Sequence, residues 1–375
     1  MSPIPLVDLA AQDAAVRDEA LAEIAKVAQG GHFILGSSVE RFERWLATAC
    51  GVRHAVGVAS GTDALELGLR ALGVGPGDGV VTPAFAFIAA AEAIAATGAR
   101  PLFCDVEDET LCASARTMAV AVERGRHLGL AVRALLPVHL FGACAPLAEL
   151  QALARSEGLA LVEDAAQALG ARDASRLAAG AVGELACFSF FPTKPLGAWG
   201  DGGAVVTDDE GFAQRIRLLR AHGATAPYVH RETGRNSRLD AIQAAVLWVK
   251  TRHLASWQEA RAKVAARYRA GLRDLPLVLA PDRPPPSVHA WHAFVVRVDG
   301  RRDALSAWLD SRAVATRVYY PLPLHRQPCF LHLGEPPCPN AERACRTALA
   351  LPMSAALTAA QAQEVIDAIR AFFEA

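Results

Sequence analysis

The chain has 375 residues, of which 52% are hydrophobic, enough for about two domains with sizeable cores. Lys and Arg number 38 and Asp and Glu number 39, for a formal net charge of −1. Because neither sign dominates, the composition disfavours a dedicated nucleic-acid-binding or membrane-surface role. The opening MSPIPLVDLAAQD contains no basic leader, and no later segment reaches about eighteen uncharged apolar residues, so we expect a cytoplasmic protein.

Between residues 52 and 207, short apolar segments alternate with segments whose apolar residues have helical spacing. This alternation is typical of an α/β fold with a mostly parallel sheet covered by helices. The expected strands are residues 55–58, 79–82, 100–104, 134–138, 160–163, 186–190 and 203–207. The expected helices between them include residues 62–72, 86–97 and 146–157.

The pattern changes after residue 239 to long helical segments at 241–254 and 257–272, followed by the proline-rich segment 281–287. We then expect a strand at 293–298, a helix at 302–311, a strand at 315–319 and terminal helices. These elements suffice for a small α+β domain. We therefore predict a large α/β domain, residues 1–255, and a smaller C-terminal α+β domain, residues 256–375.

The chain has only four lysines, and one of them differs from the rest in context. Lys26, Lys250 and Lys263 lie in amphipathic helix patterns, for which a solvent-exposed lysine is the usual outcome. Lys194 instead follows a predicted strand, lies in a turn between prolines and precedes four glycines within residues 197–203. Backbone geometry positions such a loop residue, as it does catalytic loop residues, and a lysine in open solvent is the alternative.

The eight cysteines contain no Cys-x-x-Cys pair, so we expect buried free thiols and no metal site. Cys329, Cys338 and Cys345 lie near His325 and His332 in the sequence. Their spacing matches no zinc-binding pattern.

Two further segments place polar residues at the ends of predicted strands. Ser60-Gly61-Thr62 follows a strand and opens a helix, where backbone N–H groups, a glycine and two hydroxyls suit a phosphate. The alternative is an ordinary helix N-cap by Ser60 or Thr62. The apolar residues 160–162 end in two carboxylates, Glu163 and Asp164, and Asp164 lies at the edge where open α/β sheets bind ligands. Its carboxylate either caps a helix or pairs with a buried cation.

These features, together with Ser189 five residues before Lys194, fit one cofactor, pyridoxal 5′-phosphate (PLP). Its aldehyde needs a lysine that forms a Schiff base. Its phosphate needs hydroxyls and helix-start amides, and its ring nitrogen needs a carboxylate that keeps it protonated. The combination is far more specific than any one of its parts.

The chain resembles the DegT/DnrJ/EryC1/StrS sugar aminotransferase family of fold type I PLP enzymes over nearly its whole length. This resemblance implies a mostly parallel central sheet with helices on both faces and a smaller C-terminal domain. Through FFPTKPLG, the chain is most similar to enzymes that aminate the 3-keto group of nucleotide-linked hexoses or hexuronic acids. The motifs that carry the resemblance are GHFILG (31–36), SGTDAL (60–65), LGVGPGD (72–78), PVHLFG (137–142), EDAAQALGA (163–171), FSFFPTKPLGAWGDGGAVVT (188–207) and GRNSRLDAIQAAVL (234–247).

The resemblance implies a role for each matching residue. Lys194 would form the Schiff base, Asp164 would pair with the pyridine nitrogen and Gln167 would lie near the ring 3-hydroxyl. Asn236 would complete the phosphate site from the neighbouring subunit, which implies a homodimer. Phe87 would lie against the cofactor face, although Phe85 is close in register and core packing is the alternative for both. The implied cofactor-binding residues are Gly61, Thr62, Phe87, Asp164, Gln167, Ser189, Lys194 and Asn236.

The implied reaction has two halves that use the same lysine. L-Glutamate, the usual donor of the family, would displace Lys194, whose freed amine then acts as general base. The donor leaves as 2-oxoglutarate. The pyridoxamine 5′-phosphate intermediate would then condense with a keto-sugar and deliver an amino-sugar. Lys194 and Asp164 are therefore the expected catalytic residues.

Four residues fall in motifs near the expected sugar site: His139, Arg238, Tyr320 and His325. A satisfied core histidine is the alternative for His139, and an ion pair at a helix start is the alternative for Arg238. Tyr319-Tyr320-Pro321 stands where many relatives have His-Tyr-Pro, so a phenol replaces an imidazole there.

Other functions within the same fold remain as alternatives. Related sugar dehydratases replace the Schiff-base lysine with histidine, and Lys194 argues against that activity. A non-catalytic regulatory relative would have lost Lys194, Asp164 or Ser189, and all three are present. The motifs do not separate a C3 enzyme from an aminotransferase that acts on a C4 keto-sugar or a keto-cyclitol.

Overall fold

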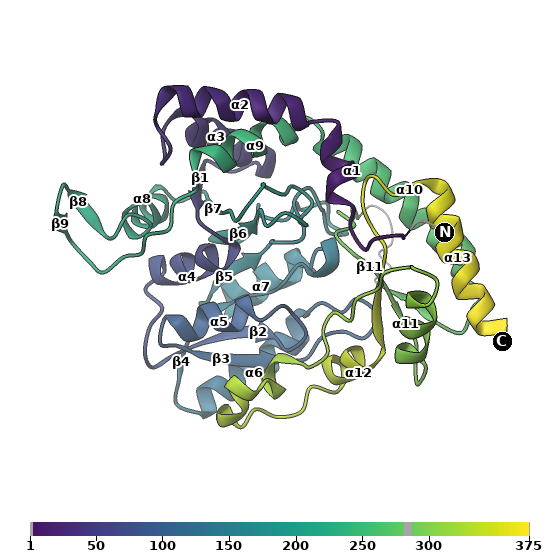
Figure 1. Ribbon diagram of the computed structural model, residues 1–375. Helices are drawn as coiled ribbons and strands as arrows, with labels where there is room; N and C mark the ends of the chain where they lie inside the picture. The colour runs from purple at the N-terminus through teal and green to yellow at the C-terminus, as the bar shows by residue number, and fades with distance from the viewer. Residues whose placement is uncertain (1–2, 281–286, 375) are drawn as a thin grey trace.

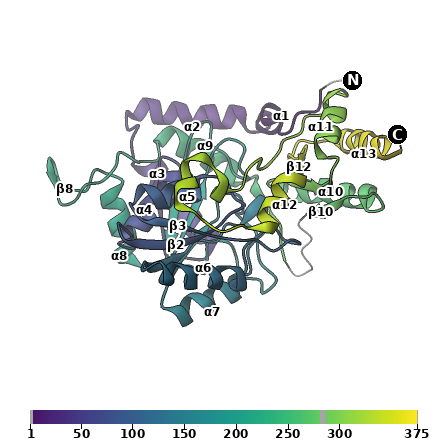
Figure 2. The same cartoon turned by 90° about the horizontal axis from the view of Figure 1, so that it is seen from below.

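A seven-stranded sheet forms the centre of the computed structural model, which describes residues 3–280 and 287–374 (Figures 1 and 2). The strand order is β1-β7-β6-β5-β4-β2-β3. Only β7 runs antiparallel to its neighbours, β1 and β6, so the sheet is mostly parallel as expected. The strands are β1 (His54–Val58), β2 (Asp78–Pro83), β3 (Arg100–Cys104), β4 (Ala131–Leu135), β5 (Ala160–Asp164), β6 (Leu185–Ser189) and β7 (Gly203–Thr207).

Helices pack on both faces of this sheet, so side chains on both faces of its strands are buried. In β7, Val205 faces one core, whereas Ala204 and Val206 face another. Such doubly covered strands carry continuous apolar residues, which explains why the segments are recognisable in the sequence. The elements around the sheet are α1 (Leu9–Ala14), α2 (Arg17–Gly30), α3 (Ser37–Cys50), α4 (Gly61–Ala71), α5 (Ala89–Ala96), α6 (Ala115–His127), η1 (Leu140–Gly142), α7 (Leu147–Glu157), α8 (Glu210–Leu219) and α9 (Ala241–Thr251).

The C-terminal part has its own three-stranded sheet, in the order β10-β11-β12, and its own core. The predicted domain boundary after residue 255 falls within the first turn of α10, and we keep that boundary as a proposal. A hairpin of β8 (Ala224–Ala226) and β9 (Val229–His230) projects from the opposite side of the molecule (Figure 1). The C-terminal elements are α10 (Leu254–Leu272), β10 (Val278–Ala280), β11 (Phe294–Arg297), α11 (Arg302–Asp310), η2 (Leu324–Arg326), η3 (Pro328–Leu333), α12 (Pro339–Thr347), β12 (Ala348–Leu351) and α13 (Ala359–Glu374).

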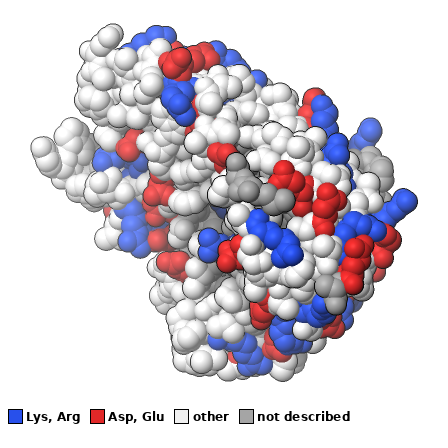
Figure 3. Space-filling view, turned by 45° about the vertical axis from the view of Figure 1, so that its right-hand side comes forward, with Lys and Arg blue, Asp and Glu red and all other residues white. Residues whose placement is uncertain are grey.

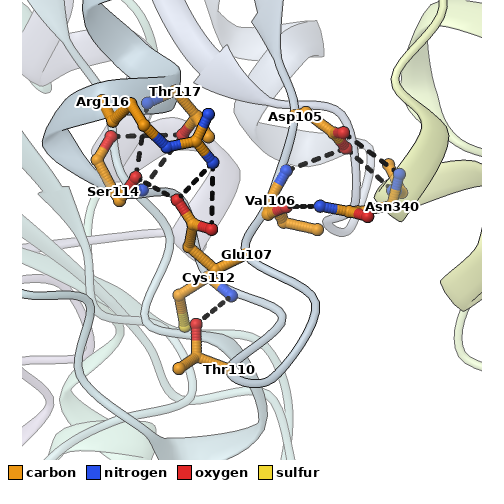
Figure 4. A network of polar contacts seen from close by, with 10 residues as sticks. Asp105, Val106, Glu107, Thr110, Cys112, Ser114, Arg116, Thr117 and Asn340 are labelled. Atoms are coloured by element: carbon orange, nitrogen blue, oxygen red, sulfur yellow. Dashed lines mark hydrogen bonds and ion pairs between the residues drawn. The ribbon is translucent and has the colours of Figure 1, made fainter.

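A polar contact ties α12 to the large sheet (Figure 4). The Asp105 carboxylate, just after β3, accepts hydrogen bonds from the backbone N–H groups of Asn340 and Ala341 at 3.0 and 2.8 Å. The Asn340 side chain in turn donates to the Val106 carbonyl at 2.8 Å. Asp105 thus satisfies N–H groups at the start of α12, which no residue within that helix can satisfy.

The structure corrects several expected elements. The expected strand at 315–319 is absent, and only Arg317 forms a bridge there, with Ala350. The strand that pairs with β11 is instead β12. Its sequence, ALAL, has no β-branched residue that would indicate a strand. β4 begins at Ala131, three residues before the expected strand, because the preceding helix α6 ends at His127. All but the last residue of the proline-rich segment 281–287 lie outside the described residues.

The structure also corrects the expectation for Lys250, whose side chain is buried and not exposed to solvent. Its side chain is 1% exposed and its Nζ lies 2.7 and 2.8 Å from the two carboxylate oxygens of Asp13. The expected pattern of buried thiols holds for seven cysteines, and Cys329 is exposed. The surface seen in Figure 3 carries both charge signs intermixed. Among the described residues, no helix has the length and hydropathy to cross a membrane.

We predict that Asp105→Ala lowers the free energy of unfolding by about 1–2 kcal/mol, because two helix-start N–H groups lose their acceptor. Urea denaturation followed by circular dichroism measures the change. Asp105→Asn retains one acceptor oxygen and serves as the milder control. An unchanged urea midpoint for Asp105→Ala would show that water replaces the carboxylate at no cost.

Candidate functional site

A cavity of about 510 Å³ opens at the carboxyl ends of the central strands. The large sheet and its loops supply one wall, and His292, Tyr319 and Tyr320 supply the other. This is the edge where open α/β sheets bind ligands. Seven of the predicted cofactor-binding residues line the cavity: Gly61, Thr62, Phe87, Asp164, Gln167, Ser189 and Lys194.

Lys194 lies in a tight loop between β6 and β7. Its backbone N–H donates to the Phe191 carbonyl at 2.8 Å, and the Ala198 N–H donates to the Phe190 carbonyl at 2.8 Å. A Cβ on Gly197 would lie 2.2 Å from the Pro192 carbonyl oxygen, so only glycine allows the loop to close. The loop thus fixes the backbone of Lys194 by its own hydrogen bonds.

The surroundings of Lys194 lower the pKa of its ammonium group. Burial lowers the pKa of Lys194 from 10.5 to about 8, and the negative charge of Asp164 opposes this shift. The ammonium group therefore loses its proton near pH 8, well below the usual range for lysine, which favours a nucleophilic amine. Because Lys194 lines a cavity together with Asp164, a lysine in open solvent does not describe it.

Asp164 ends β5 and is buried. Its Oδ1 accepts a hydrogen bond from the Ala166 N–H at 3.1 Å. The residues after it form turns, so Asp164 does not cap a helix. Burial raises the pKa of Asp164, whereas the Ala166 hydrogen bond and the charge of Lys194 lower it. A positively charged N–H group in the cavity would stabilise its ionised form.

The helix start at Ser60 is the ordinary N-cap that the sequence allowed, and its phosphate-binding role stays a prediction. Ser60 is the N-cap of α4, since its Oγ accepts from the Asp63 N–H at 3.1 Å. Gly61 follows, where an added Cβ would lie only 2.6 Å from the Ser189 Cβ. This close approach brings the start of α4 against Ser189, so the helix-start amides and the hydroxyls of Thr62 and Ser189 border one space.

Gln167 is held at both ends of its amide group. Its Oε1 accepts from the Phe141 N–H at 2.7 Å, and its Nε2 donates to the Tyr320 hydroxyl at 3.3 Å. The Tyr320 ring lies against Phe141, with centroids 6.5 Å apart. Tyr320 therefore lines the cavity as predicted, although its role toward a sugar stays a prediction.

The structure resolves the register of the two phenylalanines. Phe85 is 1% exposed and packs in the core. Phe87 is 54% exposed and lines the cavity, so core packing does not describe it. An exposed aromatic ring at a cavity suits a flat ligand.

His139 and His325 do not line the cavity, and we correct both expectations. His139 is fully buried, with Nε2 2.9 Å from a Glu163 oxygen and Nδ1 accepting from the Ala145 N–H at 3.0 Å. Both ring nitrogens are occupied, so the core-histidine alternative describes it. His325 is 1% exposed and its Nε2 lies 3.0 Å from Glu342, a residue of α12.

Asn236 and Arg238 lie apart from the cavity within one chain. Both line a second hollow of about 450 Å³, and Asp201 borders both spaces. Asn236 is exposed, and the Nε of Arg238 is buried with no partner among residues 3–280 and 287–374. No ion pair of Arg238 supports the helix-start alternative in the described part of the chain.

Sequence reasoning missed His292, which lines the cavity. It precedes a correctly expected strand, in the segment HAWHAF, and no motif distinguishes it from His289. The one feature of the sequence that could have indicated His292 is its position just before strand β11. The start of this strand contacts the large domain.

The donor set suits the cofactor predicted from the sequence. A lysine with a lowered pKa and a buried carboxylate line one cavity, and hydroxyl groups next to a helix start border it. These are the groups that an aldehyde, a protonated ring nitrogen and a phosphate need. Only glycine at residue 61 lets the start of α4 lie this close to Ser189.

We predict that Lys194 titrates near pH 8 and that Asp164→Asn moves its midpoint lower, because the lost carboxylate no longer favours the ammonium form. Reductive ¹³C-methylation labels the lysines, and NMR follows each dimethylamine signal against pH. Single Lys→Arg variants assign the signals, and Lys263 provides an exposed internal control. A Lys194 midpoint above 10 would contradict the desolvation argument.

Comparison with known proteins agrees with this site. Residues 14–370 match the DegT/DnrJ/EryC1/StrS aminotransferase family. A dTDP-3-amino-3,4,6-trideoxy-α-D-glucose transaminase of Streptomyces venezuelae is 44% identical over 99% of this chain and 96% of its own length. A UDP-N-acetyl-3-dehydro-α-D-glucosamine 3-aminotransferase of Acidithiobacillus ferrooxidans is 41% identical over 98% of this chain and 97% of its own.

A solved structure gives the same result for the fold. The crystal structure of S. venezuelae DesV in complex with a ketimine intermediate matches with a TM-score of 0.94 and 43% identity, over 100% of both chains. The fold expected from the resemblance is therefore confirmed. The chain belongs to the DegT/DnrJ/EryC1/StrS aminotransferase family and is a PLP-dependent transaminase.

Proposed function

We propose that this enzyme transfers an amino group from L-glutamate to C3 of a nucleotide-linked keto-sugar and works as a homodimer. The observation that carries the proposal is the Lys194 amine, with a pKa of about 8, in one cavity with the buried carboxylate of Asp164. Lys250, a buried lysine of α9, instead has Asp13 as its ion-pair partner and is not among the residues that line this cavity.

The residues divide the chemistry between them. When bound, PLP supplies an aldehyde and an electron-accepting ring. The Lys194 Nζ, neutral above about pH 8, is free to attack a carbonyl and later to accept and return a proton. The Asp164 carboxylate would hold a proton on the ring nitrogen. The start of α4, with Thr62 and Ser189, would bind the phosphate.

The C3 assignment follows the named relatives, both of which are described as acting on a 3-amino or 3-keto sugar. The cavity itself suits a sugar nucleotide, because Phe87 and Phe191 are about half exposed beside Tyr319 and Tyr320. Aromatic rings of this kind stack on bases and apolar sugar faces. A C4 keto-sugar or a keto-cyclitol has no such support.

The position of Asn236 supports the proposed dimer. Asn236 and Arg238 share an exposed hollow that lies outside the Lys194 cavity of the same chain. In a two-fold dimer, such a surface would meet the partner subunit, where it would complete the phosphate site.

All eight cysteines are free, which suits the reducing cytoplasm.

We predict that the PLP-loaded protein is yellow and that L-glutamate bleaches it to the pyridoxamine form. Lys194→Ala should not form the yellow species and should lose turnover by more than about a thousandfold. Absorbance spectra before and after glutamate measure the first step. Liquid chromatography of dTDP- and UDP-linked 3-keto and 4-keto sugars measures the second.

Lys263→Ala is the matched control, because Lys263 is an exposed lysine on α10. It should bind PLP and turn over like the wild type. A bound cofactor that ignores glutamate would point to another donor. Amination of the 4-keto sugar alone would reject the C3 assignment.

We predict that Asn236→Ala weakens PLP binding through the partner subunit. The variant should need about tenfold more PLP for half-saturation, because the phosphate loses a hydrogen bond. A 1:1 mixture with Lys194→Ala should recover about a quarter of wild-type activity at limiting PLP, since half of the dimers then hold one intact site.

Asn340→Ala is the control, because it removes the other asparagine of the chain from a position on α12. It should leave PLP affinity unchanged. If the mixture of Asn236→Ala and Lys194→Ala stays inactive while each variant remains dimeric, Asn236 does not serve the partner's site.

A further inference from the structure

Two side chains from the C-terminal half of the chain bind the backbone on either side of Lys194. The Arg261 Nη2 donates to the Pro195 carbonyl at 3.4 Å. His292 forms a hydrogen bond with the Thr193 backbone. The loop that carries Lys194 is therefore held at its two neighbouring residues.

Arg261 is an unusual residue to find at this position, because it is only 4% exposed. Its Nη2 also donates to the Gln12 side chain of α1 at 3.2 Å, and its Nη1 is buried with no partner among the described residues. Burial lowers the pKa of Arg261 to about 10. A buried guanidinium without a carboxylate is costly, so packing alone does not explain its presence.

His292 reaches the loop from a segment fixed to the large domain. The Ala290 N–H donates to the Gly142 carbonyl at 2.8 Å, and the Ala293 N–H donates to the Phe141 carbonyl at 3.2 Å. The segment lies so close that a Cβ on Gly142 would be 2.9 Å from the His292 backbone nitrogen. The backbone on both sides of His292 is thus anchored next to the residue that binds Gln167.

The charges around His292 keep it neutral. Burial lowers the pKa of His292 well below its usual value, and the positive charges of Lys194 and Arg261 and the nearby His289 act in the same direction. Its hydrogen bond to the Thr193 backbone opposes the shift. A neutral imidazole has one N–H to donate, and its Nδ1 has no partner in the described part of the chain.

We propose that Arg261 and His292 are positioning residues that hold the Lys194 loop through the Pro195 and Thr193 carbonyls. They keep the amine inside the cavity and away from bulk water. The inference rests on Lys194 being the reactive lysine of the proposed function. It assigns neither residue a contact with substrate.

The test is the titration of Lys194 in the cofactor-free, full-length protein, by NMR of ¹³C-methylated lysines. Arg261→Met and His292→Leu each remove one hydrogen bond to the loop, so the loop loosens and water reaches the amine. The Lys194 midpoint should then rise by about one pH unit from its value near 8, which is a tenfold loss of neutral amine at pH 7. His292→Gln retains a donor and should restore most of the wild-type midpoint.

Arg302→Met is the matched control, because Arg302 also donates to backbone carbonyls, those of Cys345 and Ala348, at 3.2 and 3.3 Å. It should leave the Lys194 midpoint unchanged. If Arg261→Met does not fold, Gln12→Ala is the milder variant, because it removes only the hydrogen bond between Gln12 and the Arg261 guanidinium. It should also raise the Lys194 midpoint.

In the PLP-loaded enzyme, the positioning variants should lower kcat by about ten- to a hundredfold and change KM for glutamate little. A Lys194 midpoint within 0.2 of a pH unit of wild type, in folded Arg261→Met and His292→Leu protein, would overturn the inference, with about 0.2 taken as the titration error. A wild-type enzyme that ignores glutamate would instead reject the proposed donor, and the midpoint shifts would stand independently.

Discussion

The Lys194 amine lies where its positive charge is disfavoured, and the rest of the site is arranged around that constraint. Burial lowers its pKa to about 8, and Asp164, the nearby carboxylate, prevents the pKa from falling further. A more exposed amine would stay protonated and unreactive, whereas a closer carboxylate would hold it as an ammonium ion. The cavity therefore has to be closed enough to exclude water and still admit two substrates in turn.

That balance depends on close packing of backbone at the strand ends. Gly61 lets the start of α4 touch Ser189, and a Cβ on Gly203 would lie 2.2 Å from the Ser60 carbonyl oxygen. The start of α4 thus lies directly against the end of β6 and the start of β7. The start of α4 and the Lys194 amine can line one small cavity only because these positions are glycine.

Most of the central sheet and most of the residues that line the cavity were predictable from the sequence, because the patterns that mark them are local. Buried parallel strands carry continuous apolar residues, and Lys194 stands out among four lysines by its loop. Long-range contacts left no such pattern. Lys250 has a helical context and still pairs with Asp13, 237 positions earlier. β12 has a helix-like sequence, and its pairing with β11 decides its conformation.

The contacts of α1 have a consequence for how the enzyme is made. Gln12 and Arg261 are 249 positions apart in the sequence, and Arg261 binds both Gln12 and the loop of Lys194. At about 5–20 residues per second, roughly 12–50 seconds of synthesis separate them on the ribosome. The sheet strands can pair as they emerge, but the lysine loop has no Arg261 to bind until α10 has left the exit tunnel. Assembly of the reactive site is thus a late event. A nascent chain that stalls before α10 contains the strands of the central sheet but lacks the Arg261 contact to the Lys194 loop.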